Sequence, residues 1–344
     1  MRHPFRVREI AAQSGLSEAT VDRALHGRSG VRASTARQVE RAVADLQRQA
    51  DQLRLGGRTW VLDVVVQAPL RFSVEVRAAL EAELPGLRPA VVRARFHLLD
   101  GADPAPVAAA LLKAASTGSD GVVLKAPQHP DVVAAVGGLA EADVPVVTLV
   151  TDLLGSPRTA YVGLDNRGAG RTAAHLVDQW LGPPCTTAAP AVLVVRGSGA
   201  DLGEDERAAG FAEVLGPRRV LEVRDDATRA RAVVDDLRVT LADDECGVGA
   251  VYAVYAGAGG VTAVLDALAR HGHEPRVVVV HDLAAEHLAL LRSGRVSAVL
   301  HHELRTHLRR AARVLLQSRG GLPGPVRSWA APVQVVTRFN VPLR

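Results

Sequence analysis

Ser198, His281 and Asp282 have the side-chain types of a hydrolase triad, in which serine attacks a carbonyl and histidine takes its proton. Such a serine needs a Gly-x-Ser-x-Gly elbow between a strand and a helix, and the sequence lacks this motif. Gly197 and Gly199 could approach phosphate, but neither Gly-x-Gly-x-x-Gly nor a Walker loop follows, so a plain turn is the better interpretation. We therefore predict no catalytic residues and expect the protein not to be an enzyme.

His301, His302 and His307 suggest a second kind of site, one that binds a metal ion. Zinc sites combine histidine with cysteine or acidic ligands at characteristic spacings, and no such set accompanies these three residues. The two cysteines, Cys185 and Cys246, form neither a paired ligand spacing nor a disulfide framework. The sequence therefore predicts no metal site and no cofactor.

Hydrogen bonding to nucleic-acid bases is a third chemistry, and it is available to residues near the N-terminus. Arg23 can donate to O6 and N7 of guanine, and Glu18 can accept from N4 of cytosine. Ser17 and Thr20 are better placed to meet phosphate. For an isolated arginine, an ion pair of Arg23 with Glu18 or with Asp22 is the simpler alternative.

Three short amphipathic helices must position these side chains. Apolar residues recur at spacings of three and four, which is the periodicity of one helix face. The three groups are Val7, Ile10 and Ala11; Val21, Ala24 and Leu25; and Val39, Ala42, Val43 and Leu46. Gly15 can adopt the positive φ of a sharp turn, and Ser17 can cap the next helix by accepting a backbone N–H. Leu16 would fill the angle of this helix-turn-helix connection, and residues 17–26 would form the recognition helix.

This N-terminal segment resembles the head of the lactose-repressor (LacI) family. The likeness is carried by VREIAAQSGLSEATVDRALHGR at 7–28, GVR at 30–32 and TARQV at 35–39, in which turn, core and recognition positions fall in register. The resemblance implies that Glu18, Ala19 and Arg23 read bases. Because Ala19 cannot hydrogen-bond, the operator preference should differ from that of better-known members. The expected DNA contacts are Ser17, Glu18, Ala19, Thr20, Arg23, His26, Arg28, Arg32 and Leu55.

The sequence departs from the family pattern after Leu46. Members usually continue with an aromatic residue, a Pro-Asn step and a hinge helix that wedges a leucine into the minor groove. Residues 47–58 contain no proline and end in a flexible Gly-Gly exit. Either Leu53 or Leu55 serves as the wedge of a hinge helix, or the third helix simply runs on to Leu55.

From Trp60 onward, short β-branched runs alternate with alanine- and leucine-rich stretches of helical length. The runs cover 60–66, 91–96, 121–124, 144–150, 191–195, 220–223, 250–252 and 277–280, and the helical stretches include 73–84, 106–116, 168–181 and 260–271. This alternation predicts parallel sheets that are covered on both faces. Eight strands divide naturally into two lobes near residue 162.

Residues 60–340 resemble periplasmic sugar-binding proteins of the ribose-binding type and the effector domains of LacI relatives. The likeness is carried by segments 145–152 and 160–170 and by Glu206-Arg207 followed by Gly210-Phe211. We therefore expect an all-α helix-turn-helix head and an α/β periplasmic-binding-protein-like body of two doubly wound parallel-sheet lobes. The expected boundaries are 1–49 for the DNA-binding domain, 50–59 for a linker or hinge helix, about 60–162 with 296–325 for lobe one, and about 163–295 with 326–344 for lobe two.

Ligands of open parallel sheets bind beyond the carboxyl ends of the strands. The resemblance implies that Arg207 donates to ligand hydroxyls, that Asp282 accepts from them, and that His302 stands where an amide is common. Charged groups and a stacking ring suit polyols, because hydroxyls need both donors and acceptors. The expected effector contacts are Phe72, Asp152, Arg207, Tyr255, Asp282 and His302.

Charge distinguishes the head from the body. Residues 1–58 contain eleven arginines and six acidic residues, whereas the rest of the chain has 30 basic and 31 acidic residues. A phosphate-binding head needs such a concentration of positive charge, although a solvated basic face would look the same. No apolar run nears the ~18 residues that cross a bilayer, and no signal peptide is evident, so we expect a cytoplasmic protein without membrane contact.

Together these features predict a sequence-specific DNA-binding transcription regulator, a repressor in the usual family direction, that binds a palindromic operator as a homodimer. A sugar-like or polyol effector would control its affinity allosterically, as an inducer or as a corepressor. The alternative is a small-solute-binding protein, or an enzyme, whose head does not read DNA specifically.

Overall fold

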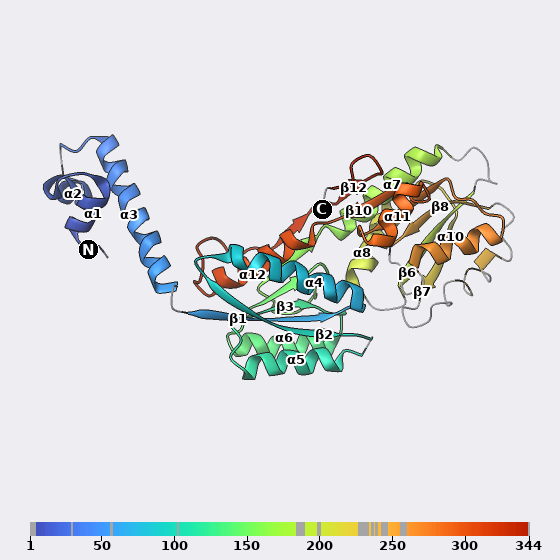
Figure 1. Cartoon of the computed structure of the whole chain (residues 1–344), viewed down its shortest axis with the longest axis horizontal. Helices are drawn as coiled ribbons and strands as arrows, with labels where there is room; N and C mark the ends of the chain where they lie inside the picture. The colour runs from blue at the N-terminus through green and yellow to red at the C-terminus, as the bar shows by residue number, and fades with distance from the viewer. Residues whose placement is uncertain are drawn as a thin grey trace. The chain divides into compact units, whose positions relative to one another are not determined.

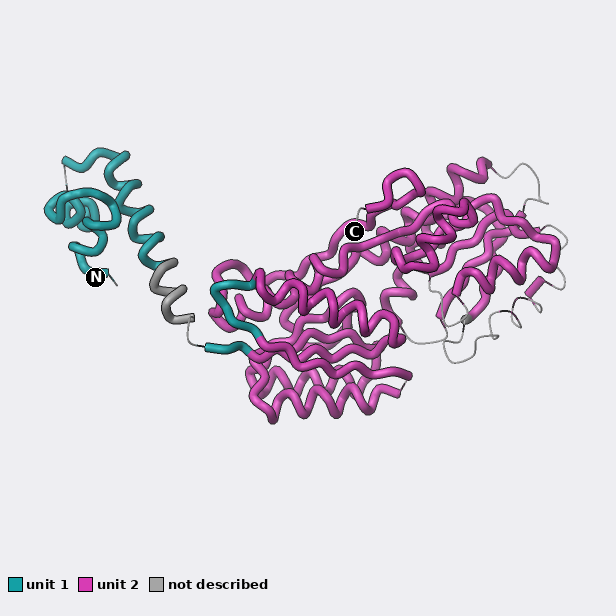
Figure 2. Tube along the Cα trace, in the orientation of Figure 1, with its two compact units in different colours: residues 1–60, 87–92 teal, residues 61–86, 93–344 magenta. Residues whose placement is uncertain are grey.

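The structure is a computed structural model that describes residues 5–28, 30–55, 58–101, 103–183, 190–197, 201–225, 234, 237, 240–241, 247–254 and 260–342; for residues 48–55 it describes only the helical backbone. The chain divides into two compact units (Figure 2), residues 1–60 with 87–92 and residues 61–86 with 93–344. In the described part of the chain, we find no helix that is both long and apolar enough to cross a membrane.

Three helices form the N-terminal part of the first unit: α1 (Val7–Ser14), α2 (Glu18–Leu25) and α3 (Ala33–Leu55). Gly15 ends α1 at a φ of 68°, in the left-handed region that glycine tolerates best, so the sharp turn predicted here is confirmed. The predicted cap is confirmed as well, because the Ser17 side chain accepts from the backbone N–H of Thr20. A small core of Ile10, Ala11, Val21, Val39 and Ala42 joins the three helices.

The first lobe of the second unit is built on a six-stranded sheet in the order β11-β5-β4-β3-β1-β2. Its strands are β1 (Thr59–Gln67), β2 (Val91–Leu99), β3 (Gly121–Lys125), β4 (Val146–Leu149), β5 (Ala160–Leu164) and β11 (Trp329–Ala331). Its helices are α4 (Leu70–Glu83), η1 (Leu84–Leu87), α5 (Ala105–Ser116), α6 (Pro130–Glu141) and α12 (Leu304–Ser318). Helices α5 and α6 cover one face, and α4 and α12 lie on the other (Figure 1).

The second lobe has the strand order β12-β10-β9-β8-β6-β7. Its strands are β6 (Ala191–Gly197), β7 (Val220–Asp225), β8 (Val248–Ala253), β9 (Val277–His281), β10 (Ala298–His301) and β12 (Gln334–Val336), and its helices are α7 (Asn166–Leu181), α8 (Leu202–Val214), α10 (Gly260–Arg270) and α11 (Ala285–Ser293). Alternate strand residues point to opposite faces. Val192 and Val194 pack under α7 and α8, whereas Leu193 and Val195 pack under α10 and α11.

The predicted pair of parallel-sheet lobes is confirmed, with one edge that differs. Strand β12 runs antiparallel to β10, with Val299 opposite Val336. The sequence predicts that the chain returns to lobe one near residue 296 and leaves it again near residue 326. Because β10 pairs with β9, and β11 pairs with β5, the chain returns to the first lobe only at 302–303 and leaves it again after Ala331.

Candidate functional site

One face of α2 presents polar side chains to solvent. Ser17 and Thr20 share a hydroxyl contact of 2.8 Å at the start of the helix, while Val21 is fully buried beneath it. Of the predicted DNA contacts, Thr20 is half-buried, and the exposed ones are Ser17, Glu18, Ala19, Arg23, His26, Arg28 and Arg32. The helix therefore offers its outer face to a partner while its inner face holds the three-helix core.

Arg23 is held along this exposed face by its own helix. Its Nε donates to the carbonyl oxygen of Ala19 at 3.2 Å. Asp22, which the sequence offers as an ion-pair partner for Arg23, lies instead 3.2 Å from His26 Nδ1 and 3.5 Å from Arg28. The guanidinium of Arg23 is thus oriented by a backbone carbonyl of its own helix.

Helix α3 continues to Leu55, which is the second of the two alternatives that the sequence left open for this segment. The Leu53 and Leu55 side chains lie outside the described residues, as does all of Tyr255. A wedge role for Leu55 and a ligand contact by Tyr255 remain predictions.

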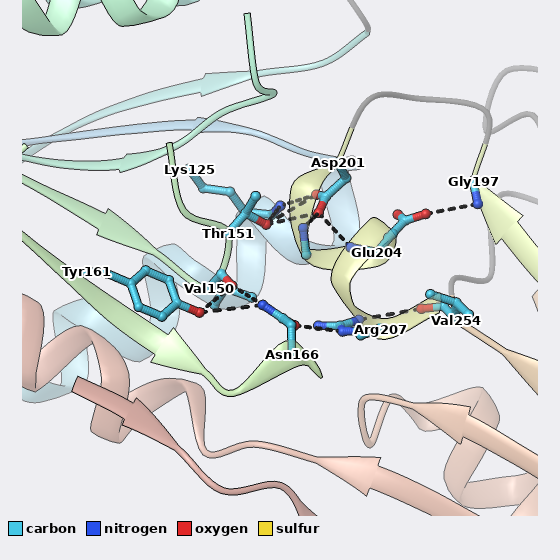
Figure 3. Close-up of polar contacts among 11 residues, drawn as sticks. Lys125, Val150, Thr151, Tyr161, Asn166, Gly197, Asp201, Glu204, Arg207 and Val254 are labelled. Atoms are coloured by element: carbon cyan, nitrogen blue, oxygen red, sulfur yellow. Dashed lines mark hydrogen bonds and ion pairs between the residues drawn. The ribbon is translucent and has the colours of Figure 1, made fainter. Parts of the chain in front are cut away.

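Residues at the carboxyl ends of β3 and β4 in the first lobe meet the start of α8 in the second lobe (Figure 3). Lys125 Nζ donates to Asp201 Oδ2 at 2.8 Å and to Thr151 Oγ1 at 3.1 Å. Thr151 Oγ1 donates in turn to Asp201 at 3.1 Å. The other oxygen of Asp201 caps α8 by accepting from Gly203 N. Asp201 therefore joins a helix cap in one lobe to a lysine of the other.

A second contact between the lobes runs through Asn166 at the start of α7. Its Nδ2 donates to the Val150 carbonyl at 3.0 Å, and its Oδ1 accepts from Arg207 Nε at 2.8 Å (Figure 3). Arg207 also donates to the Val254 carbonyl at 3.4 Å, and it is buried. The buried guanidinium is therefore fixed in direction by two acceptors.

Two carboxyl groups at the start of α8, those of Asp201 and Glu204, have very different pKa values. Burial alone would raise the pKa of Asp201, but the Lys125 ammonium lowers it to about 2. Burial and the negative charge of Asp201 raise the pKa of Glu204 to about 7. Glu204 also accepts from Gly197 N at 2.9 Å. One charged and one easily protonated carboxyl group thus lie near each other at the start of α8.

Asp282 follows β9 with a φ of 64°, an uncommon value for a residue other than glycine. Its side chain is 45% exposed, and Oδ1 lies 3.2 Å from His302 Nε2. Burial of the carboxyl opposes ionisation, but the hydrogen bond from His302 and the nearby Arg207 charge lower its pKa. The structure therefore places Asp282 against His302 and within electrostatic reach of Arg207, and contact of these residues with an effector stays a prediction.

The other two described wall residues lie in the first lobe. The Phe72 ring centre is 5.8 Å from Lys125 Nζ, so it lies beside the contact of Lys125 with Asp201. Asp152 forms a two-point ion pair with Arg158 and accepts from Thr148 at 2.7 Å. These partners occupy both of its oxygens, and they lower its pKa although burial opposes this. Asp152 is thus already bound by Arg158 and Thr148 of its own lobe.

Sequence reasoning missed Asn166, Asp201 and Glu204. The rule that ligands lie beyond strand ends directs attention to the segments around Lys125, Thr151 and Asp201, but it does not rank the side chains within them. Within the described ranges, no cluster of three or more His, Cys, Asp or Glu residues could hold a metal ion.

Comparisons with known proteins support the fold described above. A family model described as "Periplasmic binding protein domain" matches residues 80–319, which is more than half of the chain. No curated protein matches the sequence. One similar solved structure is GanP, a glucose-galactose binding protein from Geobacillus stearothermophilus, with 20% identity, a TM-score of 0.68, and coverage of 83% of this chain and 100% of that one.

Two further structures are of proteins described as transcriptional regulators. A putative LacI transcriptional regulator from Bacteroides fragilis is 15% identical, with a TM-score of 0.68 and coverage of 82% of this chain and 98% of that one. The transcriptional regulator CelR, in complex with cellobiose, is 21% identical, with a TM-score of 0.60 and coverage of 97% and 98%. At these identities the likeness extends to the fold alone.

Proposed function

Because the chain belongs to the family of periplasmic binding protein domains, we propose that it is a transcription regulator whose affinity for a DNA operator is controlled by a small carbohydrate or polyol. Such a protein needs a DNA-reading unit, a cleft for the effector, and a linkage between them. Described residues support the first two parts, and the linkage between them is itself part of the proposal.

The observation that carries this proposal is the exposed polar face of α2. Glu18, Ala19 and Arg23 lie on the solvent side of a helix that Ser17 caps, and Val21 anchors the other side. A helix presented in this way can enter the major groove with its first turn at the base edges. The fold match to CelR supports this assignment, because coverage of 97% of this chain must include most of the three-helix unit.

The cleft supports a hydroxylated effector. Lys125 and Arg207 are donors, Asp201 and Asp282 are acceptors, and Phe72 supplies a ring, which together suit a polyol. Solved structures of this fold include a protein named for glucose and galactose and a regulator complexed with cellobiose. Phe72, Arg207 and Asp282 are accordingly our proposed effector contacts, together with Tyr255, which lies outside the described residues.

We propose that the effector acts by changing how the two lobes meet. Closure of a two-lobed cleft is a rigid-body movement, and a homodimer would convert it into a change in the spacing of two DNA-reading units. A homodimer also fits a palindromic operator, with half-sites about one helical turn apart.

Selection from a random-sequence duplex library, followed by competition gel shifts with the full chain, tests the DNA-binding half of the proposal. Arg23→Ala should lose about 1 to 3 kcal/mol of specific binding and relax one base position. Arg37→Ala, at an exposed position on α3, is the control and should not relax any base position. Weak, salt-sensitive binding to every sequence would reject the proposal in favour of a solute-binding protein whose head does not read DNA.

Thermal shifts of the full chain with glucose, galactose and cellobiose test the effector half. A ligand at a hundred times its Kd should stabilise the protein by about 2.7 kcal/mol. Asp282→Ala should abolish that shift and leave operator binding intact. A normal shift in Asp282→Ala would remove Asp282 from the site.

A further inference from the structure

Of the three histidines for which the sequence predicts no metal site, His302 and His307 lie in direct contact. His302 follows β10, His307 lies in α12, and their Nδ1 atoms are 3.1 Å apart. The rings stack with centroids 4.8 Å apart and planes inclined by 10°. Both side chains are buried, so this contact is shielded from solvent.

The contacts of His302 dictate where its proton must be. Asp282 accepts at Oδ1, so His302 Nε2 must carry a hydrogen. One hydrogen lies between the two Nδ1 atoms: a neutral His302 accepts it from His307, and a cationic His302 donates it to His307. Burial, with smaller contributions from His302 and His301, lowers the pKa of His307 to about 3, so His307 is the neutral partner of the pair.

Asp282 is open to solvent, whereas His302 behind it is not. The Asp282 side chain is 45% exposed, whereas that of His302 is 3% exposed. Both ring nitrogens of His302 are already engaged, one by Asp282 and the other by His307. A small molecule in the cleft can therefore hydrogen-bond to Asp282, but it finds no free nitrogen on His302.

The other end of this chain of contacts reaches the first lobe. His307 packs edge-on against Trp329 of β11, with centroids 5.2 Å apart and planes at 73°. The guanidinium of Arg310 covers the same indole at 4.6 Å. The contacts Asp282–His302–His307–Trp329 thus run from the second sheet, through the crossing at 302–303, to the first sheet.

We propose that His302 and His307 are positioning residues: a buried imidazole pair that fixes the direction of Asp282 as the effector's acceptor and connects it to α12. This inference rests on the proposed effector site. It assigns a role to His307, and it places His302 behind the ligand contact. The pair transmits to α12 any displacement of Asp282 that a bound hydroxyl causes.

The tautomers give a test that needs no ligand. The full chain labelled with ¹⁵N-histidine should show, at pH 7, His302 protonated on Nε2 and one hydrogen between the Nδ1 atoms of His302 and His307. Other charged or titratable groups face this cluster, namely Arg207, His281, His287 and His301, so single-residue assignment is part of the measurement. A His302 that carries its neutral proton on Nδ1 would overturn the proposal.

Substitutions at His307 separate positioning from packing. Asn can place an amide near the position of Nδ1, so His307→Asn should keep the ¹⁵N shift of His302 Nδ1 near the wild-type value, whereas His307→Leu should move it towards the value of a nitrogen without a hydrogen-bond partner. His175→Leu, at an exposed position of α7, is the matched control and should change neither ring. A ¹⁵N shift of His302 Nδ1 that is the same in His307→Leu and in the wild type would overturn the role of His307.

Binding measurements connect the pair to the effector. For glucose, galactose or cellobiose, whichever the wild type binds, His307→Leu should weaken binding about fivefold, the effect of losing one hydrogen bond, and His307→Asn should restore it. Equal binding by both variants would overturn the positioning role. If the tautomers are as expected but neither the wild type nor Asp282→Ala responds to these sugars, the proposed effector function fails and the imidazole pair stands.

Discussion

The ammonium nitrogen of Lys125 lies 2.8 Å from Oδ2 of Asp201, and this ion pair joins the end of β3 in the first lobe to the cap of α8 in the second. The two side chains are 11% and 28% exposed, so solvent screens their attraction less than that of a surface pair. Thr151 contacts both groups and completes a small polar cluster. Lys125 and Asp201 thus help to hold the lobes together from within the cleft.

A double-mutant cycle should measure this contact. Lys125→Met removes the charge at similar length, and Asp201→Asn removes the partner while keeping an oxygen for the α8 cap. We expect a coupling free energy of about 1 to 3 kcal/mol, because each single variant leaves a partly buried charge without its counterion. Urea unfolding of the four proteins gives this value.

The exposed pair Arg295–Asp266 is a matched control for that cycle. Its atoms are as close, at 2.6 Å, but the side chains are 42% and 55% exposed. Coupling there should be below about 1 kcal/mol. Equal coupling energies at the two pairs would show that Lys125 and Asp201 gain nothing from their burial in the cleft.

Helices α7 and α8 approach so closely that glycine is required at the contact. A Cβ at Gly170 would lie 1.9 Å from the Arg207 carbonyl oxygen, and one at Gly210 would lie 2.1 Å from the Arg167 carbonyl oxygen. Gly170→Ala should therefore push α8 away, with a cost of about 1 to 3 kcal/mol or more in the free energy of unfolding. Arg207 would move with α8, so sugar-induced stabilisation should fall as well.

Gly137 in α6 provides the comparison, since a Cβ there meets nothing within 4 Å. Gly137→Ala should stabilise the protein by about 0.5 to 1 kcal/mol, the usual gain for alanine inside a helix. Differential scanning calorimetry should show lower stability for Gly170→Ala and higher stability for Gly137→Ala than for the wild type. Stabilisation by both alanines would contradict the tight packing of α7 against α8.

Local patterns in the sequence were sufficient to predict most elements of the fold. The continuous apolar run at residues 191–195 predicts a buried strand, and β6 is observed there with both faces covered. Gly15 and Ser17 predict a turn and a cap because each acts on backbone within a few residues. Such features depend on neighbours in the chain, which the sequence displays directly.

Features that depend on distant partners were not predictable in this way. Strands β10 and β11 are three or four residues long, so their lobe is decided by pairing with β9 and β5 and not by their own pattern. Asp201 meets Lys125 across 76 positions of sequence, and nothing local to either residue indicates the other. Arg207 and Asp282 could be proposed as effector contacts only through the likeness to known families, because that likeness assumes the fold in advance.

Glu204 should make the protein less stable in alkaline solution. Its folded pKa of about 7 lies above the ordinary 4.5, so the unfolded chain releases this proton first as pH rises. The stability that Glu204 contributes is present below pH 4.5 and is lost as pH rises through about 7. Glu204→Gln keeps an acceptor for Gly197 N and cannot ionise. Its free energy of unfolding should exceed that of the wild type at pH 8 by on the order of 1 to 3 kcal/mol, and the difference should fall below about 1 kcal/mol at pH 5.

Chemical unfolding at the two pH values tests the effect of Glu204. Glu274→Gln, at an exposed position, is the control and should change the free energy of unfolding by less than about 0.5 kcal/mol at either pH. A wild type that is more stable than Glu204→Gln at pH 8 would show that the ionised carboxylate is stabilised in the fold, contrary to its burial beside Asp201.

His307 should produce the opposite pH dependence. Its pKa falls from 6.5 to about 3 in the fold, chiefly because of burial, so the unfolded chain takes up a proton between these values while the native protein does not. The stability that depends on a neutral His307 is complete above pH 6.5 and decreases as pH falls towards 3, by up to about 1.4 kcal/mol per pH unit. His307→Asn does not titrate, so its free energy of unfolding should decrease less steeply between pH 6 and 4.5.

This window lies above the range in which Asp201 and Asp282, whose pKa values are lowered, take up protons. Because only the slope is compared, any loss of packing in the variant shifts both ends equally. The same substitution at the exposed His175 should leave the slope unchanged, and an identical slope in His307→Asn and the wild type would mean that the imidazole pair takes up a proton as easily in the fold as in the unfolded chain.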